Sequence, residues 1–110
     1  MTEKLFVYGT LGPGKPNEHI LKKIGGSWKK GYVHGKLYKE GWGALVGYPG
    51  IRLDNAGGKV HGNVFYSEKL ETYWKELDDF EGKEYQRVKT QVILEENNET
   101  VEAYVYAIRQ

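Results

Sequence analysis

A glutamate at the end of a predicted helix is the first candidate for chemistry. The helix is expected over residues 68–80, where Leu70, Trp74 and Leu77 form one apolar stripe at about 100° per residue. On the same projection Glu81 falls about 20° from Trp74, near the centre of that stripe. Burial and the negative end of the helix dipole both raise the pKa of a carboxyl. Glu81 is therefore predicted to be a general acid/base that works near neutral pH.

Two other interpretations of Glu81 stay open at this point. In the first, the end of the helix frays and the carboxylate reaches solvent. In the second, Glu81 forms a structural ion pair with Arg87, which follows it closely in the chain. Neither interpretation gives the carboxyl a role in catalysis.

The second candidate is a glycine-rich turn. Residues 9–15 fit the pattern G-x-x-x-x-G-K, which binds phosphates between a strand and a helix. Such a site needs Ser or Thr as the next residue to bind magnesium, but position 16 is Pro, and no apolar strand ends in the required Asp. We therefore do not expect nucleotide binding. The turn still presents backbone N–H groups, which can bind a carboxylate or stabilise an oxyanion.

The sequence gives no indication of a thiolate nucleophile, a metal site or a serine nucleophile. The chain has no Cys, which excludes a thiolate nucleophile, a disulfide and a cysteine-ligated metal. His19, His34 and His61 lack the spacing of metal ligands, and Ser27 and Ser67 lack the Gly-x-Ser-x-Gly turn of a serine nucleophile. We expect no metal and no cofactor.

Length and charge narrow the class of protein. A chain of 110 residues is long enough for one domain, and we expect residues 1–110 to form it. Lys plus Arg (16) nearly balance Asp plus Glu (15), which argues against a nucleic-acid partner. No apolar run approaches the roughly 20 residues of a membrane span, and the N-terminal apolar run is too short for a signal peptide. We expect a soluble, cytoplasmic protein without a membrane partner.

Short strands and tight turns must position both candidates. The 15 Gly and 9 Tyr favour strands and turns over long helices. We expect a short helix after Asn17 and a main helix with Ser67 as its N-cap and Gly82 at its end. The fold class is α+β, with a small, strongly curved or barrel-like mixed or antiparallel sheet, because curling protects strand edges. The expected strands are residues 5–8, 31–38, 50–53, 59–66, 85–94 and 100–108.

Two segments together resemble the gamma-glutamylcyclotransferase-like family. The first is Phe6-Val7-Tyr8-Gly9-Thr10-Leu11, at the end of the first strand. The second is Leu77-Asp78-Asp79-Phe80-Glu81-Gly82, followed by Tyr85-Gln86-Arg87. Over almost its whole length the chain is similar to the small-subunit branch of this family, which includes gamma-glutamylamine cyclotransferases.

The resemblance implies a small barrel-like fold and a γ-glutamyl substrate. Tyr8, Gly9, Thr10 and Leu11 would hold the glutamyl moiety through backbone groups, and Glu81 would be the acid/base. The α-amine of the substrate would attack its own γ-carbonyl, which releases the attached amine and leaves 5-oxoproline. Because the substrate supplies its own nucleophile, this reaction needs no external nucleophile and no metal.

Two alternatives remain open beside this reaction. The first is a non-catalytic module that binds a small acid in the same cavity, and the second is a related enzyme that removes a γ-glutamyl protecting group from a pathway intermediate. The presence of Glu81 favours catalysis, since a binding pocket needs no desolvated acid. One departure concerns the substrate: many relatives carry Arg directly after Leu11, whereas this chain has Gly12, with Lys15 as the nearest cation.

Overall fold

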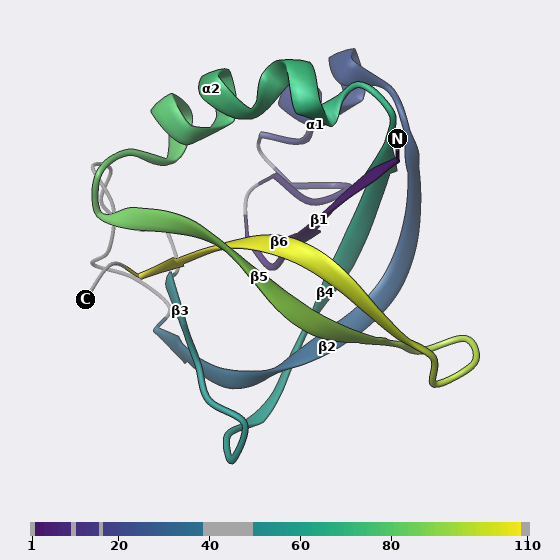
Figure 1. Ribbon diagram of the computed structural model, residues 1–110, viewed down its shortest axis with the longest axis vertical. Helices are drawn as coiled ribbons and strands as arrows, with labels where there is room; N and C mark the ends of the chain where they lie inside the picture. Colours follow the sequence, from purple (N-terminus) through teal and green to yellow (C-terminus); the bar gives the residue numbers. More distant parts are fainter. Residues whose placement is uncertain (1, 10, 16, 39–49, 109–110) are drawn as a thin grey trace.

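The chain forms a small β-barrel with two helices on one side (Figure 1). The computed structural model describes residues 2–9, 11–15, 17–38 and 50–108. The elements in chain order are β1 (Glu3–Val7), α1 (Glu18–Ile24), β2 (Ser27–Tyr38), β3 (Gly50–Leu53), β4 (Gly58–Ser67), α2 (Leu70–Glu81), β5 (Tyr85–Leu94) and β6 (Thr100–Ile108).

The barrel closes through one additional strand pairing. The strands follow the order β3-β2-β4-β1-β6-β5, and β2 also pairs with β5, where Gly31 lies opposite Leu94. Five strands therefore close on themselves, while β3 pairs with β2 outside the ring. β1 and β6 run parallel, and the other paired strands are antiparallel. The predicted α+β fold with a barrel-like mixed sheet is confirmed.

β1 is buried on both faces, which explains its continuous apolar run. Phe6 belongs to the apolar cluster that fills the barrel. Leu5 and Val7 point the other way, into a second cluster that lies between the sheet and the two helices. Because both faces are covered, β1 is held firmly, and the chain leaves it at Tyr8, the first residue of the candidate turn.

β1 and β4 approach closely at Gly62. Gly62 on β4 lies opposite Gly31 on β2. A Cβ atom on Gly62 would lie 2.3 Å from the backbone oxygen of Val7 and 2.7 Å from the ring of Phe6. No side chain fits at this position, so glycine is required for β4 to pack against β1.

α2 begins at Leu70, two residues later than predicted. The Ser67 hydroxyl donates to the backbone oxygen of Gly25 (2.7 Å) and accepts from the backbone N–H of Lys69 (3.1 Å). Lys69 occupies the N-cap position and makes no side-chain cap bond. The prediction that Ser67 caps the helix was therefore wrong: Ser67 forms a turn ahead of the helix and ties that turn to the end of α1.

The other end of α2 lies one residue later than predicted, and Gly82 follows it as expected. Glu81 is the last helical residue, and Gly82 follows with a φ of 88°, which glycine adopts at little cost. The Gly82 N–H donates to the backbone oxygen of Asp78 (3.0 Å). In the described part of the chain, neither helix has the length and apolar character that crossing a membrane would require.

Candidate active site

Glu81 lies on the buried side of α2, as its helical phase predicted. Leu70, Trp74 and Leu77 form the buried stripe of the helix. Glu81, which is partly buried, follows on the same side in the last turn. Burial raises the pKa of Glu81 from 4.5 to about 7. The carboxyl therefore exists in both protonation states near neutral pH, as a general acid/base requires.

The chain after β1 meets the end of α2 at Tyr8. Burial raises the pKa of Tyr8 well above its usual range, and the nearby negative charge of Glu81 raises it further. The Tyr8 hydroxyl stays protonated and donates to the backbone oxygen of Tyr106 (2.5 Å). Two of the predicted site residues, Tyr8 and Glu81, thus lie near one another although they are far apart in sequence.

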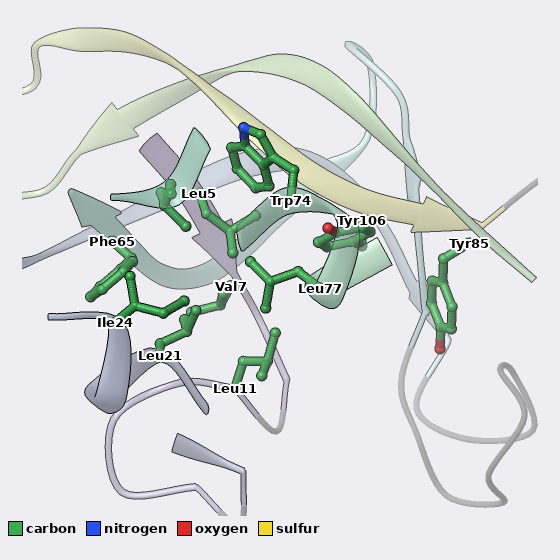
Figure 2. Packing of buried hydrophobic residues seen from close by; sticks show 11 residues of the cluster. Leu5, Val7, Leu11, Leu21, Ile24, Phe65, Trp74, Leu77, Tyr85 and Tyr106 are labelled. Carbon is green, nitrogen blue, oxygen red and sulfur yellow. The ribbon is translucent and has the colours of Figure 1, made fainter. Parts of the chain in front are cut away.

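The rest of the predicted turn is anchored from within. The Gly12 N–H donates to the backbone oxygen of Gly9 (3.2 Å). Leu11 is buried in the cluster under the helices, and Figure 2 shows Leu77 amid Val7, Leu11 and Tyr106. Since the Leu11 side chain is used for packing, only its backbone is left to contact a ligand. Thr10, which was also predicted to bind substrate, lies outside the described residues.

The second half of the glycine-rich segment uses its N–H groups in local hydrogen bonds. The Gly14 N–H donates to the Glu18 carboxylate (2.9 Å), and the Lys15 N–H donates to the Gly12 backbone oxygen (3.1 Å). A carboxylate beside these amides repels an incoming phosphate. Asn17, predicted to cap α1, makes no side-chain cap bond. The Gly14 and Lys15 N–H groups are therefore already used within the segment and by the first residue of α1.

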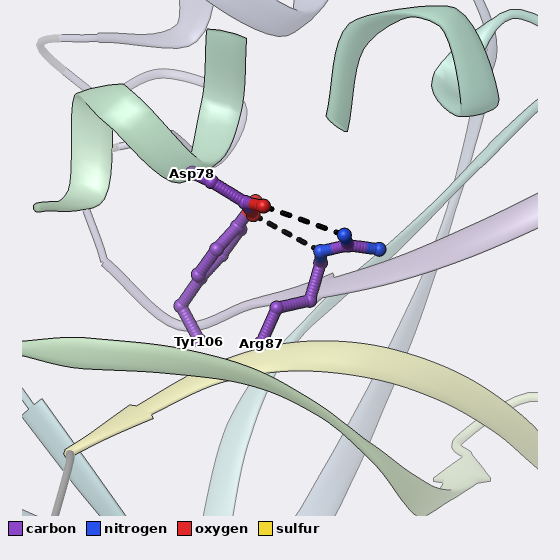
Figure 3. Close-up of polar contacts among 3 residues, drawn as sticks. All are labelled: Asp78, Arg87 and Tyr106. Atoms are coloured by element: carbon purple, nitrogen blue, oxygen red, sulfur yellow. Dashed lines mark hydrogen bonds and ion pairs between the residues drawn. The ribbon is translucent and has the colours of Figure 1, made fainter. Parts of the chain in front are cut away.

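A polar cluster that the sequence did not reveal lies beside Glu81. Asp78, one helical turn before Glu81, accepts from Arg87 Nε (3.0 Å) and Nη2 (3.4 Å) and from the Tyr106 hydroxyl (2.6 Å) (Figure 3). We call Asp78, Arg87 and Tyr106 the Asp78 cluster. Arg87 on β5 and Tyr106 on β6 lie directly opposite one another in the sheet. The interpretation that Glu81 pairs with Arg87 was wrong, because Arg87 binds Asp78.

Tyr106 is the most constrained member of the Asp78 cluster. Its side chain is buried, and burial, followed by the hydrogen bond to Asp78, raises the pKa of Tyr106 well above its usual range. The negative charge of Glu81 contributes in the same direction, whereas the positive charge of Arg87 lowers the pKa. Tyr106 is therefore a permanent hydrogen-bond donor close to Glu81.

A cavity opens at the C-terminal end of α2. Its volume is ≈ 460 Å³, within the range of small-molecule sites. The residue after Glu81 and all three members of the Asp78 cluster contribute to its wall. The lining residues are Asp78, Asp79, Gly82, Lys83, Tyr85, Gln86, Arg87 and Tyr106.

Two of the three histidines take part in local contacts. His34 Nδ1 lies 3.1 Å from the backbone oxygen of Gly57, and His61 Nδ1 lies 3.2 Å from the Glu95 carboxylate. Within the ranges that the structure describes, no three His, Asp or Glu side chains come together in a way that could hold a metal ion.

Known proteins are similar to this chain over most of its length. The family described as "Gamma-glutamyl cyclotransferase, AIG2-like" matches residues 5–110. The Drosophila melanogaster protein "Putative gamma-glutamylcyclotransferase CG2811" is 32% identical over 114 residues, which cover 99% of this chain and 71% of that protein. The crystal structure of an AIG2-like protein from Mus musculus has a TM-score of 0.72 and 26% identity, covering 96% of this chain and 76% of that one. A solution structure from Arabidopsis thaliana has a TM-score of 0.76 and 25% identity, covering 98% of this chain and 62% of that one.

Proposed function

Because this chain belongs to the gamma-glutamyl cyclotransferase, AIG2-like family and is an enzyme of that type, we propose that it cyclises a γ-glutamyl amine or γ-glutamyl amino acid. The products are 5-oxoproline and the free amine. The observation that carries the proposal is the buried Glu81 carboxyl beside Tyr8, with its pKa raised by burial to about 7. We also propose that residues 1–110 act as one domain.

The reaction is an intramolecular acyl transfer. The α-amine nitrogen of the substrate attacks the γ-carbonyl carbon, which forms the C–N bond of the ring. The original C–N bond to the amine then breaks, so no water is consumed. A site that holds the substrate folded, with amine and carbonyl in contact, supplies much of the rate enhancement.

The α-ammonium nitrogen carries three hydrogens and the ring nitrogen of 5-oxoproline carries one, so the reaction moves two protons to the departing nitrogen, which leaves as an ammonium ion. Glu81 relays these protons one after the other. As a carboxylate it removes a proton from the α-ammonium, which frees the nitrogen lone pair for attack. As a carboxylic acid it gives that proton to the departing nitrogen, which is otherwise a poor leaving group. A carboxyl with a pKa raised by burial to about 7 can perform both steps near neutral pH.

The turn after β1 holds the glutamyl moiety in this proposal. Tyr8, Gly9, Thr10 and Leu11 act through their backbone groups, which fits the burial of the Leu11 side chain. Their N–H groups bind the α-carboxylate or the oxyanion that forms on the γ-carbonyl. The Tyr8 hydroxyl, which stays neutral, lies near Glu81.

The direct test is turnover of a panel of γ-glutamyl amines and γ-glutamyl amino acids, with 5-oxoproline as the measured product. Glu81→Gln keeps the shape of the side chain and should lower kcat by roughly 10²-fold or more with little change in KM. Glu71→Gln is the matched control, since it makes the same chemical change at an exposed position of α2.

The products separate the proposal from its alternatives. Release of glutamate in place of 5-oxoproline would identify a hydrolase that removes a γ-glutamyl group with water. Saturable binding of the panel compounds without any product would identify a binding module. A Glu81→Gln variant that turns over substrate as fast as the parent would contradict the assigned acid/base.

A further inference from the structure

Tyr106 forms hydrogen bonds to both parts of the candidate active site, the turn after β1 and the C-terminal end of α2. Its backbone oxygen accepts from the Tyr8 hydroxyl at the turn after β1. Its side-chain hydroxyl donates to Asp78 at the end of α2 (2.6 Å). The side chain is only 5% exposed, so water competes little for either bond. One residue of β6 therefore links the turn to the helix that carries Glu81.

Asp78 transmits this constraint to Glu81. Residues three apart on a helix lie on neighbouring positions of one side, so the last turn of α2 moves as a unit with Asp78. Arg87 holds the same carboxylate from β5, and its guanidinium lies 4.3 Å from the centre of the Trp74 ring. The last turn of α2 contains no basic residue, so Arg87 also supplies the positive charge that a helix C-terminus favours.

We propose that Tyr106 is a positioning residue of the enzyme, which sets the place of Glu81 relative to the turn after β1 through Asp78. The inference rests on the proposed function of Glu81. Proton transfer between Glu81 and the substrate nitrogen requires hydrogen-bond distance to a substrate held by the turn. The two bonds of Tyr106 fix this separation across three elements that are not adjacent in sequence.

Tyr106→Phe tests the proposal, because it removes the hydroxyl and keeps the ring and the backbone oxygen. Since a displacement of about 1 Å can cost roughly 10²-fold in rate, we expect kcat to fall about 10- to 100-fold while KM changes less than about 2-fold. Tyr104→Phe is the matched control. It removes a hydroxyl from the same face of the same strand, where Tyr104 packs against Trp74.

A second readout follows the Glu81 carboxyl without substrate. The pH titration of Glu81 by NMR should have its midpoint shifted towards 4.5 in Tyr106→Phe, because a loosened helix end admits water, and should not shift in Tyr104→Phe. In the described part of the chain, the titratable and charged groups around this end of α2 include Tyr8 after β1, Asp78 and Asp79 on α2, Lys83 and Glu84 between α2 and β5, Tyr85 and Arg87 on β5, and Tyr106 on β6.

Two Asp78 variants provide the test if Tyr106→Phe does not fold. Asp78→Asn keeps an oxygen that accepts from the Tyr106 hydroxyl, whereas Asp78→Ala does not, and both lose the ion pair with Arg87. The proposal predicts a kcat for Asp78→Asn at least about 10-fold above that for Asp78→Ala. Equal losses in the two variants would overturn it.

The outcomes separate this inference from the proposed function. If the parent is active and Tyr106→Phe has the same kcat or the same Glu81 titration midpoint as Tyr104→Phe, the proposed positioning role of Tyr106 is overturned. If the parent turns over no γ-glutamyl compound, the proposed function fails. The Glu81 titration in the two Tyr variants then decides by itself whether Tyr106 sets the place of this carboxyl.

Discussion

Replacement of Glu81 by Gln should make the protein progressively more stable than the parent as the pH rises. The folded protein holds the Glu81 proton more tightly than the unfolded chain, because burial raises the pKa of Glu81 from 4.5 to about 7. The folded state therefore binds more protons between these two pH values. The free energy of unfolding of the parent then falls as the pH rises from 4.5 to about 7 and levels off above. A Gln side chain does not titrate, so the free energy of unfolding of Glu81→Gln does not fall for this reason.

The size of the effect follows from the same two values. A pKa that moves from 4.5 to about 7 corresponds to roughly 3 kcal/mol, at about 1.4 kcal/mol for each pH unit. The difference in unfolding free energy between Glu81→Gln and the parent should therefore grow by up to about 3 kcal/mol between pH 4 and pH 8. This is a large fraction of the stability of a small domain.

Denaturant titrations of both proteins at pH 4, 5, 6, 7 and 8 measure this difference directly. Glu71→Gln on the same helix is the control, because its side chain is exposed and burial cannot produce the pH-dependent difference there. A difference between Glu81→Gln and the parent that stays constant from pH 4 to pH 8 would show that the carboxyl is solvated. The acid/base assignment would then lose its physical basis.

Three further outcomes are expected. Gly9→Val should abolish binding of a γ-glutamyl amine by a folded protein, because the branched side chain blocks approach to the backbone of the turn. Calorimetric titration measures the affinity, and an unchanged affinity would exclude the turn as the binding site. Gly62→Ala should lower the melting temperature strongly or prevent folding, since its Cβ atom would lie 2.3 Å from the Val7 backbone oxygen, and thermal unfolding by circular dichroism checks it. ATP with magnesium should leave the melting temperature unchanged, whereas a shift that grows with ligand concentration would show that a nucleotide binds.

Sequence patterns predicted the elements whose burial depends on local periodicity. The apolar run at β1 signalled a strand covered on both faces, and Phe6 and Val7 indeed point into two different clusters. The helical phase of Leu70, Trp74 and Leu77 placed Glu81 on the buried side of α2 without knowledge of the barrel. A period of 3.6 residues is fixed by backbone geometry, so the phase needs no tertiary information.

The contacts made by the barrel could not be predicted in this way. Arg87 and Tyr106 reach Asp78 only because β5 and β6 pair in one particular register. A shift of that register by one residue would place one of these two side chains on the opposite face of the sheet from the other. The predicted start of α2 was wrong for a similar reason. The Ser67 hydroxyl is bonded to the backbone oxygen of Gly25, a residue at the end of α1 that is distant in sequence. Asp78 itself offered one signal, because it precedes Glu81 by one helical turn.

The place of β1 between β4 and β6 has a consequence for how the protein is made. The Tyr8 hydroxyl bonds to a backbone oxygen 98 residues further along the chain, and the barrel ring has no closed form without β6. Contacts between such distant residues slow folding, because loop-closure entropy is lost before the contacts form. A ribosome must therefore release the chain as far as the end of β6 before β1 gains its second neighbour. Until then β1 exposes a strand edge that can pair with another chain, so an incomplete chain is expected to aggregate and to show no partial activity.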